Sequence, residues 1–259
     1  MHSRTLRISS LAVAFAASAV ACGGGDAEAP GRTPLADKWL LRADASYKAG
    51  DFDDAQSSAG AALDVAPKDP AIRVLNAKLA LAHLDYARAL TLTEGLQTTE
   101  AHGIRGRAHW YAGEIDDAAD DLEAELQDPS VKDVWAGEVS KLARRGSGRH
   151  PFAIDGGILA EVEMPPAGAA LVVPCDLEGE HILAVIATAS GEVILDSNTR
   201  RDPAWVNLTF GDQAQIEVHD VPALTEDLSP LSRQLGAPVK ALLGVNLLRH
   251  LHATFDRRG

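Results

Sequence analysis

The spacing of apolar residues divides the sequence into two stretches with different periods. From Leu35 to about Arg145, Ala and Leu recur at helical intervals with Asp and Lys between them, which predicts amphipathic helices. Beyond about residue 152 the pattern changes to short apolar runs separated by Gly, Asp and Pro, which predict strands. The predicted fold class is therefore α+β in two domains, all-α helices over 35–145 followed by a mostly β domain over 152–259.

The helical stretch contains an internal repeat. Residues 45–55 read ASYKAGDFDDA, and Ala62 and Pro67 follow at regular positions. This unit closely resembles one tetratricopeptide repeat, with Trp39 and Ala43 where that pattern has its tryptophan and a small residue. The alanines would let paired helices approach closely, and Pro67 would end the unit.

The repeat recurs twice further along the chain. Tyr86 lies 34 residues after Phe52 in a second copy, and a third copy spans 113–118 after a shortened second unit. A final helix from about Pro129 to Leu142 is predicted to cap the end of the array, as such stacks require. An irregular helical bundle is the alternative. The basic, glycine-containing stretch over 146–151 is predicted to link the two domains.

The predicted strands of the second domain are short and rich in β-branched or aromatic residues. They are Leu159–Met164, Leu171–Val173, Ile182–Ile186, Val193–Leu195, Trp205–Phe210 and Gln213–Val221. A short helix over Leu228–Leu235 and a final segment over Leu242–Asp256 complete the domain.

The first residues have the features of a signal peptide. Arg4 and Arg7 precede an apolar run over 8–20, which is far shorter than the roughly 20 residues of a membrane span. The small residues 19–21 stand immediately before Cys22, and this arrangement resembles the lipobox of bacterial lipoproteins. The resemblance implies a signal peptide over 1–21 and a lipid on Cys22. An ordinary signal peptide with a nearby cysteine is the alternative.

Composition narrows the possible partners. The Gly- and Pro-rich residues 22–34 are predicted to form a flexible tether between the lipidated cysteine and the helices. The chain carries 24 basic and 37 acidic residues, so its net charge of -13 disfavours nucleic acid as a partner. If Cys22 is lipidated, Cys175 is the only remaining thiol, and no intramolecular disulfide can form.

Three segments of the second domain, taken in chain order, carry a resemblance to a known family. They are the apolar strand within 177–186, the turn Ala187-Thr188-Ala189-Ser190 with the strand 193–196 after it, and the segment 241–249 with 254–256. In this order they resemble the retropepsin-like aspartyl protease family, whose turn reads Asp-Thr-Gly-Ala or Asp-Thr-Gly-Ser and whose closing segment contains Leu-Gly. The resemblance covers roughly 158–257 and implies a mostly β, retropepsin-like barrel. A generic β sandwich or barrel is the alternative.

The departure from the family's pattern bears directly on catalysis. In such proteases two carboxylates about 3 Å apart share a proton and activate water. Ala187 stands where the family has its aspartate, and Ala189 replaces the glycine. The resemblance also implies a possible homodimer through this domain, but both copies would carry Ala187. We therefore predict a pseudoenzyme without a catalytic residue in this turn.

A shifted alignment offers an alternative. It would place Asp196-Ser197-Asn198 on the motif, with asparagine in place of glycine and about ten residues left before the next strand. Asp196 would then be the catalytic residue, and the alternative function is an aspartic-type endopeptidase.

Other reactive residue types give weaker signals. His250 and His252 alternate and could share a face as metal ligands, but no third ligand lies near them in the sequence, which favours surface histidines. Ser190 lacks the first glycine of a nucleophile elbow. Cys175 is expected to be a buried thiol. We predict no cofactor and no metal.

The helical array offers a candidate surface for a partner. In tetratricopeptide arrays the first helix of each pair lines a concave groove, and the matching positions here carry mixed charges and aromatic rings. They are Asp44, Tyr47, Lys48, Lys78, Arg107, Trp110 and Tyr111. Such a surface suits an extended peptide or an acidic chain end. The alternative is that Tyr47 and Trp110 are packing residues between helices.

Together these features predict a lipid-anchored protein of the bacterial cell envelope, on the periplasmic side or at the cell surface. Its expected role is non-catalytic binding or scaffolding of a protein or peptide partner. A purely structural spacer is a further possibility.

Overall fold

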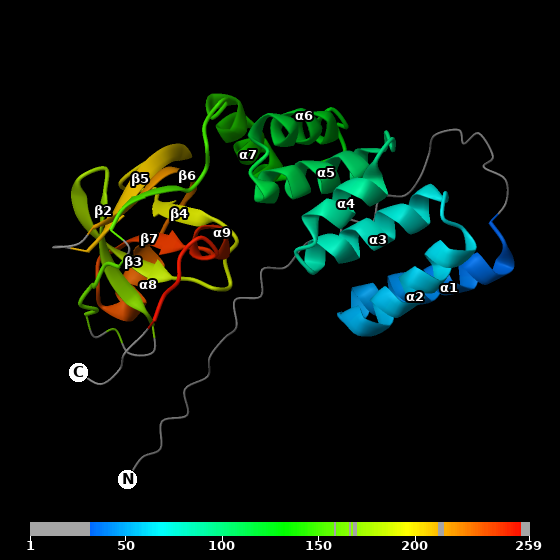
Figure 1. Ribbon diagram of the computed structural model, residues 1–259, viewed down its shortest axis with the longest axis horizontal. Helices are drawn as coiled ribbons and strands as arrows, with labels where there is room; N and C mark the ends of the chain where they lie inside the picture. Colours follow the sequence, from blue (N-terminus) through cyan, green and yellow to red (C-terminus); the bar gives the residue numbers. More distant parts are fainter. Residues whose placement is uncertain (1–31, 158, 166, 168–169, 212–214, 255–259) are drawn as a thin grey trace, which may run out of the picture. The chain divides into compact units, whose positions relative to one another are not determined.

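The computed structural model describes residues 32–157, 159–165, 167, 170–211 and 215–254 (Figure 1). The predicted signal peptide, Cys22 and nearly all of the tether lie outside the described residues. From Thr33 onward the chain forms one compact unit with helices first and a mostly β part after them. The predicted α+β class is therefore confirmed. None of the helices in the described part of the chain combines the length and apolarity that a bilayer span requires.

The helical array consists of antiparallel pairs that follow one another along the chain (Figure 1). Its helices are α1 (Pro34–Ala49), α2 (Phe52–Val65), α3 (Pro70–Ala82), α4 (Tyr86–Thr93), α5 (Thr99–Ala112), α6 (Ile115–Leu126) and α7 (Val134–Arg145). Each helix packs on the next, and the first helices of successive pairs also touch, α1 with α3 and α3 with α5. The last helix begins at Val134, later than the predicted Pro129, because Asp133 caps its first turn.

The loops after α1, α3 and α5 share one backbone geometry. Gly50 and Gly113 adopt φ angles of 78° and 85°, and Leu84 adopts 59° at the equivalent position of the second pair. In each loop the following amide donates to a carbonyl five residues earlier. These bonds are Asp51 N to Ser46 O, Asp85 N to Ala80 O and Glu114 N to His109 O. The same helix ending therefore recurs in all three pairs, which confirms the repeat predicted from the sequence.

Small side chains fill the contacts between helices. Ala43, Ala55 and Ala59 are fully buried between α1, α2 and α3, and methyl groups at these points let the helix backbones approach closely. Buried Asn76 of α3 donates to Ala59 O at 3.0 Å and to Ile72 O at 2.9 Å, which ties α3 to α2.

The second part of the unit is a closed β barrel with one strand added outside it. Its elements are β1 (Ala153–Gly156), β2 (Val172–Leu177), β3 (Glu180–Ile186), β4 (Val193–Asp196), β5 (Ala204–Phe210), β6 (Ile216–Glu226), α8 (Ser229–Leu235), β7 (Val239–Leu243) and α9 (Val245–Leu248). The strand order is β1-β6-β4-β7-β3-β2-β5, and β5 also pairs with β6, which closes the ring. The parallel pairs β3 with β7 and β4 with β6 join strands that are far apart in sequence.

The structure corrects several predicted boundaries in this part. Residues 159–164, predicted as a strand, have no regular structure, and the four-residue β1 was not predicted. Alternation alone does not make a strand, because a strand also needs a neighbour with which to pair. β6 continues to Glu226, beyond the predicted end at Val221. The predicted final segment is divided, since β7 ends at Leu243 and the short helix α9 follows.

Candidate functional site

Four of the predicted groove positions lie on the surface of α1 and α3. Lys48 Nζ contacts Asp44 Oδ2 at 2.6 Å on α1, and Lys78 of α3 pairs with Glu100 of α5. Tyr47 is half-buried beside them. Lys48 and Glu100 are exposed and Asp44 and Lys78 are partly exposed, so this surface carries charges of both signs on successive first helices.

The other three predicted positions, all on α5, are occupied by contacts within the protein. Trp110 is 2% exposed, and Tyr111 stacks on Tyr86 and on Trp135 with ring centroids 5.8 and 6.1 Å apart. Arg107 pairs with Glu125 and Asp133, and its guanidinium lies 5.2 Å from the Trp135 ring. These three side chains pack between elements. On α1, Tyr47 also packs against the cluster between α1, α2 and α3 and meets the Phe52 ring edge-on with centroids 5.8 Å apart, whereas the charged positions Asp44, Lys48 and Lys78 reach solvent.

Trp110 and Tyr111 belong to a joint where the array meets the barrel. Trp110 Nε1 donates to Glu192 Oε2 at 3.3 Å, immediately before β4. Trp205 of β5 donates its indole N–H to Leu142 O at 2.8 Å and meets the Trp110 ring edge-on. Leu224 of β6 packs into the same cluster as α6 and α7. The joint is therefore a continuous layer of aromatic and apolar contacts.

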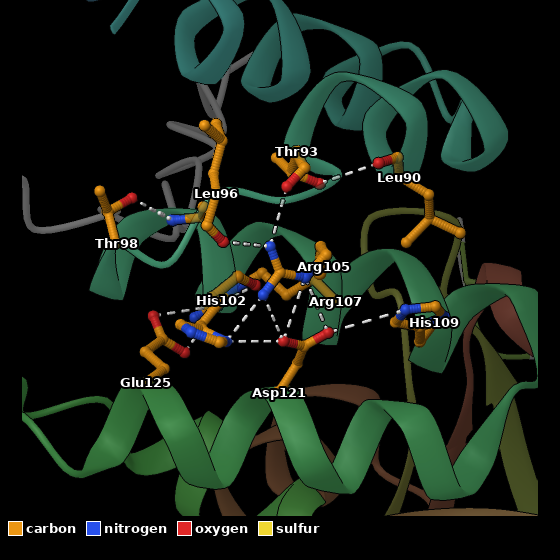
Figure 2. A network of polar contacts seen from close by, with 12 residues as sticks. Leu90, Thr93, Leu96, Thr98, His102, Arg105, Arg107, His109, Asp121 and Glu125 are labelled. Atoms are coloured by element: carbon orange, nitrogen blue, oxygen red, sulfur yellow. Dashed lines mark hydrogen bonds and ion pairs between the residues drawn. The ribbon is translucent and has the colours of Figure 1, made fainter. Parts of the chain in front are cut away.

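A second polar cluster lies inside the array (Figure 2). Arg105 of α5 donates to the carbonyls of Thr93 and Leu96 at 2.9 and 2.8 Å, at the end of α4 and just beyond it. Its other nitrogens bind Asp121 of α6, and Asp121 Oδ1 also lies 2.7 Å from His102 Nδ1. One guanidinium thus connects α4, α5 and α6.

Sequence reasoning missed this cluster because its members are far apart along the chain. A signal was present in the two mid-helix glycines of α5. A Cβ at Gly103 would lie 2.1 Å from Glu125 Oε1, and one at Gly106 would lie 2.7 Å from Leu122. Glycines inside a helix mark a close approach of another element, here α6.

One group in the described residues has donor atoms close enough for a metal ion. The ligand atoms of His109, Glu114 and Asp117 all lie within 4.8 Å of one another. Both carboxylates stand at the start of α6, where the helix dipole favours negative charge without any ion. The helix dipole and the pairing of Glu114 with His109 explain this arrangement, which does not by itself define a metal centre.

Backbone hydrogen bonds fix the turn over residues 187–190, where the resemblance to retropepsin-like proteases places the catalytic motif. Ala187 N donates to Leu243 O at 3.0 Å, Val245 N donates to Ser190 O at 2.9 Å, and Asn246 N donates to Gly191 O at 2.9 Å. The turn after β3 is thereby fixed to the corner between β7 and α9. Ala187, half-buried at its start, offers only a methyl group, which can neither hold water nor take a proton.

Asp196, the alternative catalytic residue, is a buried ion-pair member. It ends β4, is 4% exposed, and lies 2.9 Å from Lys240 Nζ. Burial acts to raise the pKa of this carboxyl, but hydrogen bonds from Lys240, Asn198 and the Leu228 amide lower it to about 2. The side chain is therefore held ionised by partners that occupy both oxygens, an environment suited to structure and not to proton transfer.

None of the remaining candidate residues has the surroundings of a catalytic or metal-binding group among the described residues. His250 stacks on Phe152 with ring centroids 4.8 Å apart, and burial lowers its pKa. His252 is exposed. Ser190 donates its hydroxyl to Glu192 O at 3.0 Å, as a turn residue does. Cys175 is buried as predicted, and burial raises the pKa of its thiol to about 12.

Comparison with known proteins shows similarity to tetratricopeptide domains. No protein-family model and no curated protein matches the sequence. Among solved structures, the Arabidopsis OM64 TPR domain is 18% identical and covers 44% of this chain and 98% of that domain, with a TM-score of 0.40. The first TPR of Spaghetti (RPAP3), bound to the HSP90 peptide SRMEEVD, is 19% identical over 43% of this chain and 91% of that one, with a TM-score of 0.39. The first TPR domain of human RPAP3 gives 19%, the same coverage and 0.38.

The class of protein follows from the chain's own elements. Three helix pairs with matching ends form a tetratricopeptide-like array, and a closed six-strand barrel follows it.

Proposed function

We propose that this chain is an exported, lipid-anchored protein whose helical array binds an extended segment of a peptide or protein partner across α1 and α3. The observation that carries the proposal is that two solvent-accessible ion pairs lie on successive first helices, Asp44 with Lys48 and Lys78 with Glu100. Exposed pairs of this kind are worth little to stability, so charged groups of a ligand can replace either partner at low cost. Tyr47 beside them adds a ring on which a ligand can pack.

The barrel is proposed to be retropepsin-like and inactive. Ala187 supports this because no carboxylate stands at the turn, and a homodimer through the barrel would bring together two such turns. The ion pair of Asp196 with Lys240 supports it too, because a carboxyl held ionised cannot share a proton with a second one.

The binding surface is tested by selecting peptides with free carboxyl ends from a random library on the full chain and measuring their affinity by fluorescence anisotropy. The double change Lys48→Ala and Lys78→Ala should weaken binding roughly tenfold, about 1.4 kcal/mol. Lys68→Ala, an exposed lysine between α2 and α3, is the matched control and should leave affinity unchanged. Equal affinity of the double variant, or selection of no peptide, would rule out this surface.

The absence of catalysis has its own test. The purified chain should not cleave an unstructured protein between about pH 4 and pH 7, where paired carboxylates operate. Cleavage that disappears in Asp196→Ala would instead establish the endopeptidase.

A further inference from the structure

The joint between array and barrel is closed around a buried carboxyl group. Glu192 is 6% exposed, and its Oε2 accepts the hydrogen bond from Trp110. Tyr111 and Trp135 contribute further side-chain hydrogen bonds to this carboxyl. Its other oxygen, Oε1, is buried without a hydrogen-bond partner among the described residues. A carboxylate with one bare oxygen is costly to bury, whereas the neutral acid costs much less because it carries no charge.

The charged and titratable groups around Glu192 do not offset this cost. Immediately after α9, Arg249 is the cation that acts on Glu192, but its guanidinium donates to Tyr111 O and lies 5.9 Å from the Tyr86 ring. From α5, Arg107 is already paired with two carboxylates. Tyr86 of α4 and Tyr111 of α5 are the titratable groups facing it, and α7 presents the uncharged Trp135.

Taken together, these surroundings raise the pKa of Glu192. Burial raises the pKa of Glu192, and the hydrogen bonds from Tyr111, Trp110 and Trp135 and the charge of Arg249 lower it only in part. The geometry agrees, since a neutral carboxyl leaves no bare charge at Oε1.

We propose that Glu192 is a pH-responsive lock, whose neutral form holds α5 and α7 against the barrel and whose ionised form loosens this joint. Ionisation of Glu192 would loosen the contact between array and barrel without unfolding either part, because each part has a hydrophobic core of its own. The barrel core is formed mainly by strands β2 to β7, and α1 to α5 are packed in clusters that contain no barrel residue. Opening the joint would expose the rings of Trp110, Trp135 and Trp205 and leave those cores intact.

The sign of the pH effect follows from linkage. Glu192 in the docked form has a pKa above that of a glutamate in water, about 4.3. Docking is therefore strongest below about pH 4.3 and weakens as the pH rises from there through the raised pKa, because the undocked form releases the proton more readily. Well above the raised pKa, Glu192 is ionised in both forms, so the docking contribution of its neutral form is fully lost and no longer changes with pH.

The lock can be followed by tryptophan fluorescence of the full chain. The protein has four tryptophans, and Trp39→Phe removes the one on α1, so that emission reports only on the joint. From about pH 4 to about pH 9 we expect a red shift with a one-proton profile and a midpoint above the ordinary glutamate range. Far-ultraviolet circular dichroism should stay constant across the same range.

Two variants decide the outcome. Glu192→Gln keeps the size of the side chain without its charge, so its emission should stay blue and flat with pH. Glu226→Gln, an exposed glutamate at the end of β6, should retain the wild-type transition. Flat emission in the wild type, or a transition that survives in Glu192→Gln, would overturn the proposal.

Discussion

Lys240 Nζ lies 2.9 Å from Asp196 Oδ2 and joins β7 to the end of β4. The same carboxylate accepts the amide of Leu228 at 3.4 Å and the side-chain amide of Asn198 at 3.0 Å. One buried charge therefore fixes the end of β4, the entry to α8 and the start of β7. Its surroundings explain a structural role more directly than a catalytic one.

Asp196→Asn should destabilise the barrel. The change leaves the half-buried Lys240 without its counter-charge, and a cost of about 2 kcal/mol is expected. Since the pKa of Asp196 is lowered to about 2 on folding, its contribution is present above about pH 3.9 and is lost as the pH falls toward 2.

Urea unfolding at several pH values measures this contribution. The stability difference between wild type and Asp196→Asn should shrink as the pH falls from about 5 to about 2. Asp202→Asn, on an exposed loop, is the control and should follow the wild type. A difference that does not change with pH would contradict the assignment.

Leu84→Gly should stabilise the array. Leu84 is 62% exposed and has a positive φ at the helix ending where Gly50 and Gly113 stand. A leucine in the left-handed conformation is strained by about 1 to 2 kcal/mol, and glycine would remove this strain. Glycine also has more conformational freedom in the unfolded chain, which offsets part of the gain, so the net stabilisation is expected to be about 0.5 to 1 kcal/mol. Thermal unfolding measures it. Gly50→Ala should change stability in the opposite direction, and a loss of stability in Leu84→Gly would refute the equivalence of the loops.

Arg105→Met should weaken the link between the second and third helix pairs. Methionine fills similar space, but Asp121 would lose its partly buried partner and the carbonyls of Thr93 and Leu96 would lose their donor. A loss of about 3 kcal/mol in unfolding free energy is expected. Arg88→Met, at an exposed position of α4, is the matched control. Similar stability of the two variants would show that the network contributes little.

Cys22→Ser should abolish membrane anchoring. A thioether-linked lipid requires the sulfur, so intact-mass measurement should lose the acyl mass and the protein should move from the detergent phase to the aqueous phase. Cys175→Ser, at the buried thiol of the barrel, should keep the lipid. Acylated protein from Cys22→Ser would exclude Cys22 as the attachment site.

The sequence predicted the features that depend on local patterns. The helix pairs were predictable because Gly50, Phe52 and Ala55 mark the first unit within a few residues, and Tyr86 and Ala89 repeat two of these positions in the second. The barrel's strand order was not, since β3 and β7 pair across more than fifty residues and no local signal carries that pairing. β1 was missed because its four residues are all exposed and carry no alternating pattern.

The candidate site was predictable only in part for the same reason. Positions on α1 and α3 follow directly from the repeat. The burial of Trp110 and Glu192 depends on contacts between the array and the barrel, and 82 residues separate the two side chains. Gly191 immediately before Glu192 suggests a turn, which by itself gives no hint of a buried acid.

The parallel pairing of β3 with β7 also determines when each part of the chain can fold. Neighbouring helices of the array meet as soon as each pair has been synthesised, whereas the barrel cannot close until residues 239–243 are present. Local contacts form fast, and closure between distant strands is slow. The array can therefore be complete before the barrel closes, and the last strands can assemble beside helices that have already folded.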